Sequence, residues 1–196
     1  MKTLKECLEM KRSLLSICLL LGLFSLLVGC DSVLEKEKKE PVDVLMDYKD
    51  TAVGDATAVS HISYILPAGE HVKQIDLQTK ETPYEITIDY GVKEDSDTTV
   101  EDFENEWDEN NTKRALLNNA IAFFILVNNV DVVHFNVETE TPVSFSITRE
   151  DIDTFVGKDV REYSNDAKLW KVEIEEDIIS DDAKVNAFYA MHPLQS

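Results

Sequence analysis

Cysteine is scarce in this 196-residue chain, and none of its three cysteines lies beyond residue 30. Disulfide bonds therefore cannot cross-link the rest of the chain, and its stability must come from a hydrophobic core. Glycine and proline are also few, with 6 and 5 residues, which excludes collagen-like and low-complexity architectures. The 43% hydrophobic content is typical of a globular domain.

Basic residues are also scarce. The 19 lysines and arginines stand against 39 aspartates and glutamates, so the formal net charge is -20 at pH 7. Such a chain repels phosphate groups, which argues against binding to nucleic acid and against adsorption to anionic lipid headgroups. We therefore expect no nucleic-acid partner.

Catalytic and cofactor motifs are missing as well. The sequence has no GxSxG elbow, no SxxK, HExxH or CxxC motif, and no glycine loop that could cradle a phosphate. The four histidines are far from one another along the chain: His61, His71, His134 and His192. We therefore expect no cofactor, no metal site and no catalytic residue, and we interpret the protein as a non-enzyme. A zinc site assembled from residues far apart in the sequence is the alternative.

The N-terminal segment has the pattern of an export signal. Two basic residues, Lys11 and Arg12, precede an uncharged run over residues 14–28 that is shorter than the ~20 residues of a membrane-spanning helix. The run ends in Leu27-Val28-Gly29-Cys30, which resembles a bacterial lipobox. We expect residues 1–29 to be a lipoprotein signal peptide and Cys30 to be the fatty-acylated first residue of the mature protein. An uncleaved anchor helix is the alternative.

Two segments follow the predicted cleavage site. Residues 30–46 carry mixed charge, lack an apolar period and contain Pro41, so we interpret them as a tether. Residues 47–196 contain no second linker and no internal repeat, and we expect them to form a single domain. Removal of residues 1–29 takes away 4 basic and 2 acidic residues, which leaves the mature chain with 15 against 37 and a formal charge of -22.

The apolar pattern within the domain alternates between the helical period and the strand period. It predicts helices over residues 56–66, 114–127, 149–156 and 181–190, and strands over residues 72–78, 84–90, 133–137, 143–147 and 170–175. Asp55 is a predicted N-cap, Thr148 and Asp151 form a predicted capping box, and Asn128 or Asn129 is expected in a left-handed C-cap. The predicted fold class is α+β: helices packed on one face of a mainly antiparallel sheet built from two hairpins plus a C-terminal strand.

An acidic stretch from Glu94 to Asn110 holds nine acidic residues and no basic one. Four of its carboxylates fall at ligand positions of a calcium-binding EF-hand loop, but Thr99 and Val100 replace a required ligand and the required glycine. We therefore expect a solvated, partly disordered loop. Trp107 lies within it, and an indole in such surroundings either folds back onto the domain or serves as a partner contact.

A set of short apolar and turn motifs runs through the predicted domain from about residue 47 to residue 170. The set comprises Val53-Gly54-Asp55, Ile65-Leu66-Pro67, Leu77-Gln78-Thr79, Pro83-Tyr84, Tyr90, Asn119-Ala120, Phe124, Asn128-Asn129, Val133, Phe135, Ile147-Thr148-Arg149, Gly157 and Arg161-Glu162-Tyr163-Ser164. In this order and spacing the motifs resemble the domain of unknown function 4825 family found in Bacillota. The resemblance implies an extracytoplasmic lipoprotein, or a domain attached to a membrane-embedded sensor peptidase of the antibiotic-response type. It carries over no catalytic residue.

These patterns together predict a lipid-anchored protein on the extracytoplasmic face of the cell membrane of a Gram-positive bacterium. We expect its domain to bind or sense a basic peptide or a membrane protein, because its own charge is strongly negative. Two alternatives remain open. One is a cell-envelope hydrolase with a site assembled from dispersed polar residues, and the other is an accessory or inhibitory subunit of a membrane sensor.

Overall fold

A four-stranded sheet organises the part of the chain that the computed structural model describes, residues 39–94 and 96–196. The predicted signal peptide, Cys30 and the first part of the predicted tether lie outside the described residues. Within them, no helix combines the length and the apolar character that a membrane crossing requires.

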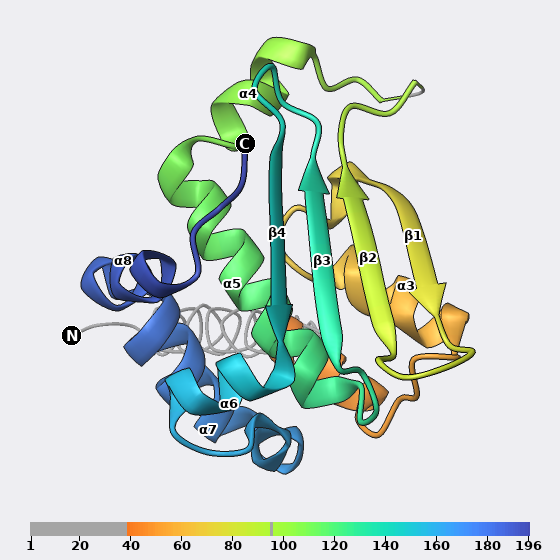
Figure 1. Cartoon of the computed structure of the whole chain (residues 1–196), viewed down its shortest axis with the longest axis vertical. Helices are drawn as coiled ribbons and strands as arrows, with labels where there is room; N and C mark the ends of the chain where they lie inside the picture. Colours follow the sequence, from red (N-terminus) through yellow and green to blue (C-terminus); the bar gives the residue numbers. More distant parts are fainter. Residues whose placement is uncertain (1–38, 95) are drawn as a thin grey trace, which may run out of the picture. The chain divides into compact units, whose positions relative to one another are not determined.

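The strands lie in the order β1-β2-β3-β4, which is also their order along the chain. β1 (Val72–Gln78) pairs with β2 (Glu85–Tyr90), and β3 (Val132–Val137) pairs with β4 (Val143–Thr148), both antiparallel. The two predicted hairpins are confirmed. The central pair, β2 and β3, is parallel, because the chain crosses over between them through α4 (Val100–Glu106) and α5 (Glu109–Leu126) (Figure 1).

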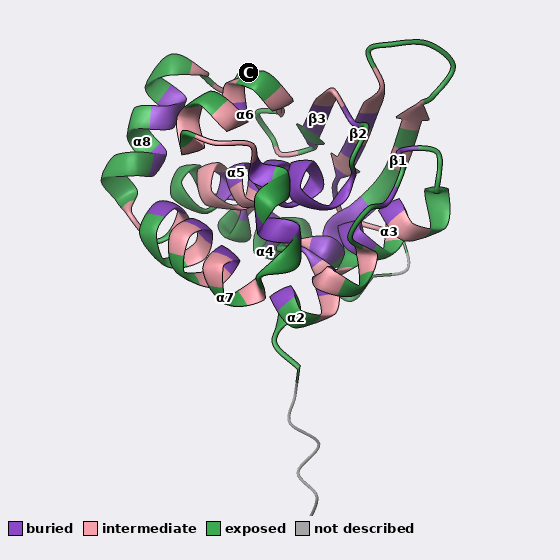
Figure 2. Cartoon of the chain, turned by 90° about the horizontal axis from the view of Figure 1, so that it is seen from below, coloured by how far each residue is buried: buried purple, intermediate pink, exposed green. Residues whose placement is uncertain are grey.

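The register gives the sheet one apolar face and one polar face. Ile75, Ile88, Phe135 and Phe145 are paired across the four strands and form one row toward the helices. The neighbouring row, Asp76, Thr87, His134 and Ser146, lies on the opposite face. The helices pack on the apolar face, and among the described residues none covers the polar one (Figures 1 and 2).

The helix predicted over residues 114–127 is α5, which begins five residues earlier, at Glu109. Asp108 caps it by accepting hydrogen bonds from the backbone N–H groups of Asn110 and Asn111. Leu116, Leu117 and every residue from Asn119 to Leu126 are buried (Figure 2). The predicted left-handed cap is wrong: Asp50 and Ala68 are the non-glycine residues with positive φ in the described chain. The Asn129 side chain instead accepts from the Val53 N–H at 2.8 Å.

The predicted C-terminal strand over residues 170–175 is also wrong. Trp170 ends α7 (Ala167–Trp170), and a π-helix, η4 (Lys171–Ile179), follows directly. Trp170, Ile174 and Ile178 are buried and lie four residues apart, a spacing that keeps them on one face of a wide helix. Val172, which a strand would place beside Trp170, is 39% exposed.

The remaining short helices follow the sequence signals. In α3 (Ala56–Ile65) the Asp55 side chain accepts from the Ala58 N–H, and α6 (Arg149–Val156) has the predicted Thr148–Asp151 capping box and ends at left-handed Gly157. The predicted C-terminal helix is α8 (Asp182–Met191). Short 3-10 helices cover Met46–Tyr48, Gly69–His71 and Val160–Asn165, labelled η1, η2 and η3.

The packed part of the chain begins before residue 47. α2 (Pro41–Leu45), which the sequence analysis assigned to the tether, is helical, and its Val42 and Leu45 are 1% and 3% exposed. Pro41 at the first helical position suits a helix start, because its missing N–H has no partner to lose there.

The acidic stretch is not mainly a loop. Thr99 caps α4 by accepting from the Asp102 N–H, and acidic residues in the first turn favour the helix N-terminus. Phe103 and Trp107 lie one turn apart and are 1% and 7% exposed. This apolar pair holds the otherwise charged helix against the core.

Candidate functional site

Trp107 folds back onto the domain, the first of the two outcomes considered for it. Its ring lies 4.9 Å from that of Tyr90 and 5.9 Å from that of Phe103, measured between centroids. Its indole Nε1 is buried without a hydrogen-bond partner among the described residues. A buried donor without an acceptor carries a free-energy cost.

A depression of about 850 Å³ lies on one side of the indole, and we call it the Trp107 groove. α4 and the start of α5 contribute Glu104, Trp107 and Glu109, the β3–β4 turn contributes Glu140, and α8 and the C-terminal tail contribute Tyr189 and Leu194. The groove therefore combines aromatic and aliphatic walls with three carboxylates.

The carboxylates of the groove differ in how they are held. Glu104 Oε1 accepts from the backbone N–H of Glu140 at 2.6 Å, which ties the β3–β4 turn to α4. Glu109 pairs with Lys113 at 2.5 Å, one helical turn away on α5. The Glu140 side chain has no such partner among the described residues, and it is exposed. Two of the three carboxylates are thus fixed by the fold, and the third faces water.

A second pocket, of about 460 Å³, is also lined by Trp107, and we call it the Arg114 pocket. Its wall includes Ala68 from the loop after α3, Arg114 from α5, and Glu175 from η4. Arg114 forms an ion pair with Asp182. Burial raises the pKa of the Glu175 carboxyl above its ordinary value, and nearby Lys171 opposes that rise.

Glu106, at the edge of the Arg114 pocket, belongs to a cluster with Glu70 and His71. One ligand atom from each of the three side chains lies within 4.8 Å of the others. The closest pair is His71 Nε2 and Glu106 Oε2, at 2.7 Å. No sequence motif indicated this group of possible ligands, because Glu106 lies 35 residues after His71 and only the fold brings them together.

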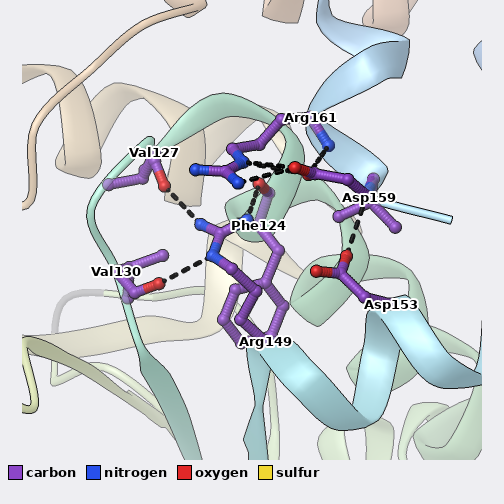
Figure 3. Close-up of polar contacts among 8 residues, drawn as sticks. Phe124, Val127, Val130, Arg149, Asp153, Asp159 and Arg161 are labelled. Carbon is purple, nitrogen blue, oxygen red and sulfur yellow. Dashed lines mark hydrogen bonds and ion pairs between the residues drawn. The ribbon is translucent and has the colours of Figure 1, made fainter.

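Arg149 makes the most extensive side-chain network (Figure 3). Its guanidinium donates to the carbonyl oxygens of Phe124 at 2.7 Å, Val127 at 2.8 Å and Val130 at 3.1 Å. These carbonyls belong to the end of α5 and the segment after it. Burial lowers the Arg149 pKa, and the charge of Arg161 lowers it further. The arrangement closes the C-terminus of α5, and we assign it a structural role.

A line of polar side chains crosses the uncovered face of the sheet. His134 Nδ1 lies 2.7 Å from Ser146 Oγ, and His134 Nε2 lies 3.4 Å from Glu85 Oε2. The three residues come from β4, β3 and β2. They line neither the Trp107 groove nor the Arg114 pocket. His134 lies between buried Val133 and Phe135 along β3, so the strand alternation places it on this polar face.

The family described as a domain of unknown function (DUF4825) matches residues 45–148. The chain belongs to this family. No curated protein and no solved structure matches the chain.

The DUF4825 match runs from the last residue of α2 to the last residue of β4. It therefore contains the whole sheet with α3, α4 and α5, and all of the Glu70, His71 and Glu106 cluster. The resemblance noted in the sequence runs to residue 170 and so includes α6, η3 and α7, whereas the family match ends at Thr148. The Trp107 groove is lined both by residues within the matched segment, such as Trp107, and by Tyr189 and Leu194, which lie beyond it.

Two site residues came from the sequence. Cys30, the predicted lipidation site, lies outside the described residues. Trp107, the predicted partner contact, is in the wall between the groove and the pocket. The sequence missed Arg149, although a capping box begins at the residue before it and indicated a helix start there.

Proposed function

We propose that the protein is a lipid-anchored extracytoplasmic binding module, held at the membrane by acylated Cys30 and acting without turnover. The anchor is supported by the Leu27-Val28-Gly29-Cys30 motif at the end of a short apolar run. Each buried methylene of an acyl chain contributes about 0.8 kcal/mol of membrane affinity, so a diacylated cysteine gives a stable anchor.

The observation that carries the binding function is the composition of the Trp107 groove. Glu104 and Glu140 supply negative charge, whereas Glu109 is paired with Lys113, which also lines the groove. Trp107 and Tyr189 line the groove with the small part of each side chain that stays accessible, since they are 7% and 5% exposed. Lysine and arginine side chains fit such a site, because their stems pack on apolar walls while their charged ends reach carboxylates.

The ligand class is therefore a basic peptide or a basic loop of a membrane protein. The formal charge of -22 of the mature chain, with 15 basic and 37 acidic residues, attracts such a partner before contact. This steering acts over about 8 Å at physiological ionic strength, so it speeds encounter while the groove provides the specific contacts. A membrane sensor in the same bilayer is a partner that the lipid anchor would bring within reach.

Site-specific cross-linking in the native membrane tests this proposal. A photo-reactive amino acid at position 140 lies at the groove, and the same residue at exposed Glu81, in the β1–β2 turn, is the matched control. We expect position 140 alone to give one discrete adduct, with a partner segment rich in lysine or arginine. Equal adducts at both positions, or an acidic partner segment, would contradict the groove as the binding surface.

One observation favours a hydrolase as a second candidate, namely the alignment of Ser146, His134 and Glu85. A serine beside an imidazole that a carboxylate orients is the arrangement of serine hydrolases. Here it lies on a sheet face that no helix of the described residues covers (Figures 1 and 2). A fluorophosphonate probe discriminates: labelling of the wild type that Ser146→Ala abolishes would establish the hydrolase, and the binding module predicts no labelling.

A further inference from the structure

His71 presents an imidazole nitrogen to two carboxylates that come from different parts of the chain. The His71 side chain is 4% exposed, and its Nε2 lies 2.7 Å from Glu106 Oε2. Glu70, exposed to solvent, brings a third ligand atom within 4.8 Å of the other two. The donor set is thus one buried nitrogen and two oxygens at the surface.

The backbone that carries His71 is fixed on both sides. Its N–H donates to the Ala68 carbonyl at 3.0 Å, and its carbonyl accepts from the Gly91 N–H at 2.9 Å. Ala68 has a left-handed φ of 61°, and a Cβ atom at Gly69 would collide with the backbone carbonyl of Tyr64. A non-glycine residue held in that conformation stores strain of the kind found at ligand sites.

The imidazole ring is fixed as well as its backbone. Phe103 packs edge-on against it, with the ring centroids 5.1 Å apart. Glu106 lies on the same helix as Phe103, about one turn later, and its side chain is 47% exposed. The nitrogen is therefore held in place from inside the fold, while the carboxylates can adjust from the solvent side.

We propose that Glu70, His71 and Glu106 bind a divalent transition-metal ion of the zinc type. Zn²⁺ takes imidazole nitrogen and carboxylate oxygen at about 2.0–2.2 Å, which places tetrahedral ligand atoms about 3.4 Å apart. His71 Nε2 and Glu106 Oε2, now 2.7 Å apart, have to separate by about 0.7 Å to reach that spacing. The ion takes the place of the hydrogen bond between His71 and Glu106, and water completes its coordination.

The chemistry of the donors separates zinc from the common hard cations. Calcium and magnesium prefer sets made of oxygen alone, and magnesium gives up its waters reluctantly. A set with one imidazole favours a first-row transition metal. The formal charge of -20 raises the local concentration of any cation, so it does not by itself provide this selectivity.

Calorimetric titration of the full chain in detergent, after treatment with a chelator, tests the site with Zn²⁺ and with Mg²⁺ as the reference ion. We expect zinc to bind at one site and magnesium to show no comparable binding. Glu70→Gln with Glu106→Gln should weaken the zinc affinity at least tenfold. Glu81→Gln with Glu162→Gln removes the same charge from exposed positions outside the cluster and should leave the affinity unchanged.

His71→Gln removes the nitrogen but also alters a buried position, so its result is read together with the carboxylate pair. Co²⁺ in place of Zn²⁺ gives a second readout, because its visible absorption reports the ligand geometry. We expect an intense tetrahedral spectrum that the Glu70 and Glu106 changes abolish. Zinc binding no tighter than magnesium binding, or equal weakening by the control pair, would overturn the site. Neither result bears on peptide binding in the Trp107 groove, which these residues do not line.

Discussion

The guanidinium of Arg149, the first residue of α6, donates a 2.7 Å hydrogen bond to the carbonyl oxygen of Phe124 in the last turns of α5. The same guanidinium lies over the Phe124 ring, 5.0 Å from its centroid. One side chain therefore joins the most buried helix to the element that follows β4. This contact connects the family segment to the C-terminal helices, because the match ends at residue 148.

Replacing Arg149 should destabilise the fold. Arg149→Lys keeps the charge but cannot reach three carbonyl groups, so buried acceptors lose their donor. We expect a loss of about 2–4 kcal/mol in the free energy of unfolding, measured with urea. Arg161→Lys is the matched control, because Arg161 is exposed and pairs with Asp159 alone. That pair should be worth less than about 1 kcal/mol. Equal losses would refute the capping role of Arg149.

Truncation of Phe124 should be costly, because its side chain is 0% exposed. Phe124→Ala empties a core site and should lower the free energy of unfolding by about 3–5 kcal/mol. Met191→Ala removes apolar atoms from a residue that is 62% exposed, and it should cost far less. A Phe124 variant as stable as the Met191 variant in the same urea titration would contradict the packing of α5.

The strands β3 and β4 and the helix α5 could be predicted from the sequence, because each of their apolar patterns fits only one type of secondary structure. Val133, Phe135 and Val137 fit a strand and no helical stripe. Trp170, Val172 and Ile174 are different, since Trp170 and Ile174 lie on one face in a strand and also in a helix. Only tertiary packing decides between a strand and a helix here, and the exposure of Val172 shows that the segment is helical.

The parallel pairing of β2 with β3 and the site geometry were out of reach for a different reason. Both depend on which elements meet after a long crossover, and periodicity carries no information on that. Trp107 was singled out by its acidic surroundings, yet the sequence could not show that Tyr189 and Leu194, far along the chain, line a groove with it. His71 looked isolated because its partner Glu106 comes from another element.

The raised pKa of Glu175 predicts a dependence of stability on pH. The folded state holds this proton more tightly than the unfolded state, so stability falls as the pH rises through the interval between the two pKa values. Glu175→Gln removes that penalty and should be more stable than the wild type at pH 7. The gain should disappear below about pH 4, where both states are protonated. Glu162→Gln, at an exposed position, shows the effect of net charge alone. If the two variants have the same dependence of stability on pH, burial of Glu175 is not the cause.

Acylation of Cys30 can be measured directly. Metabolic labelling with an alkyne fatty acid should mark the wild type and should not mark Cys30→Ala. Cys18→Ala is the control, because it removes a cysteine within the predicted signal peptide and should leave the label in place. Label that persists in Cys30→Ala would refute the lipoprotein assignment.

The central claim, that the Trp107 groove binds basic peptides, is tested most directly by fluorescence titration. Trp170→Phe leaves Trp107 as the sole indole, since the chain has two tryptophans. An oligolysine peptide titrated into this variant of the full chain in detergent should give a saturable change in Trp107 emission that weakens as salt is added.

Paired glutamine variants in the same background locate the binding. Glu104→Gln with Glu140→Gln, in the groove, should weaken oligolysine binding about fivefold or more, because two carboxylates lose their charge. Glu81→Gln with Glu162→Gln, outside the groove, should change it less than twofold. If both pairs weaken binding equally, or Trp107 emission does not respond to the peptide, the account of this groove as the binding site is contradicted.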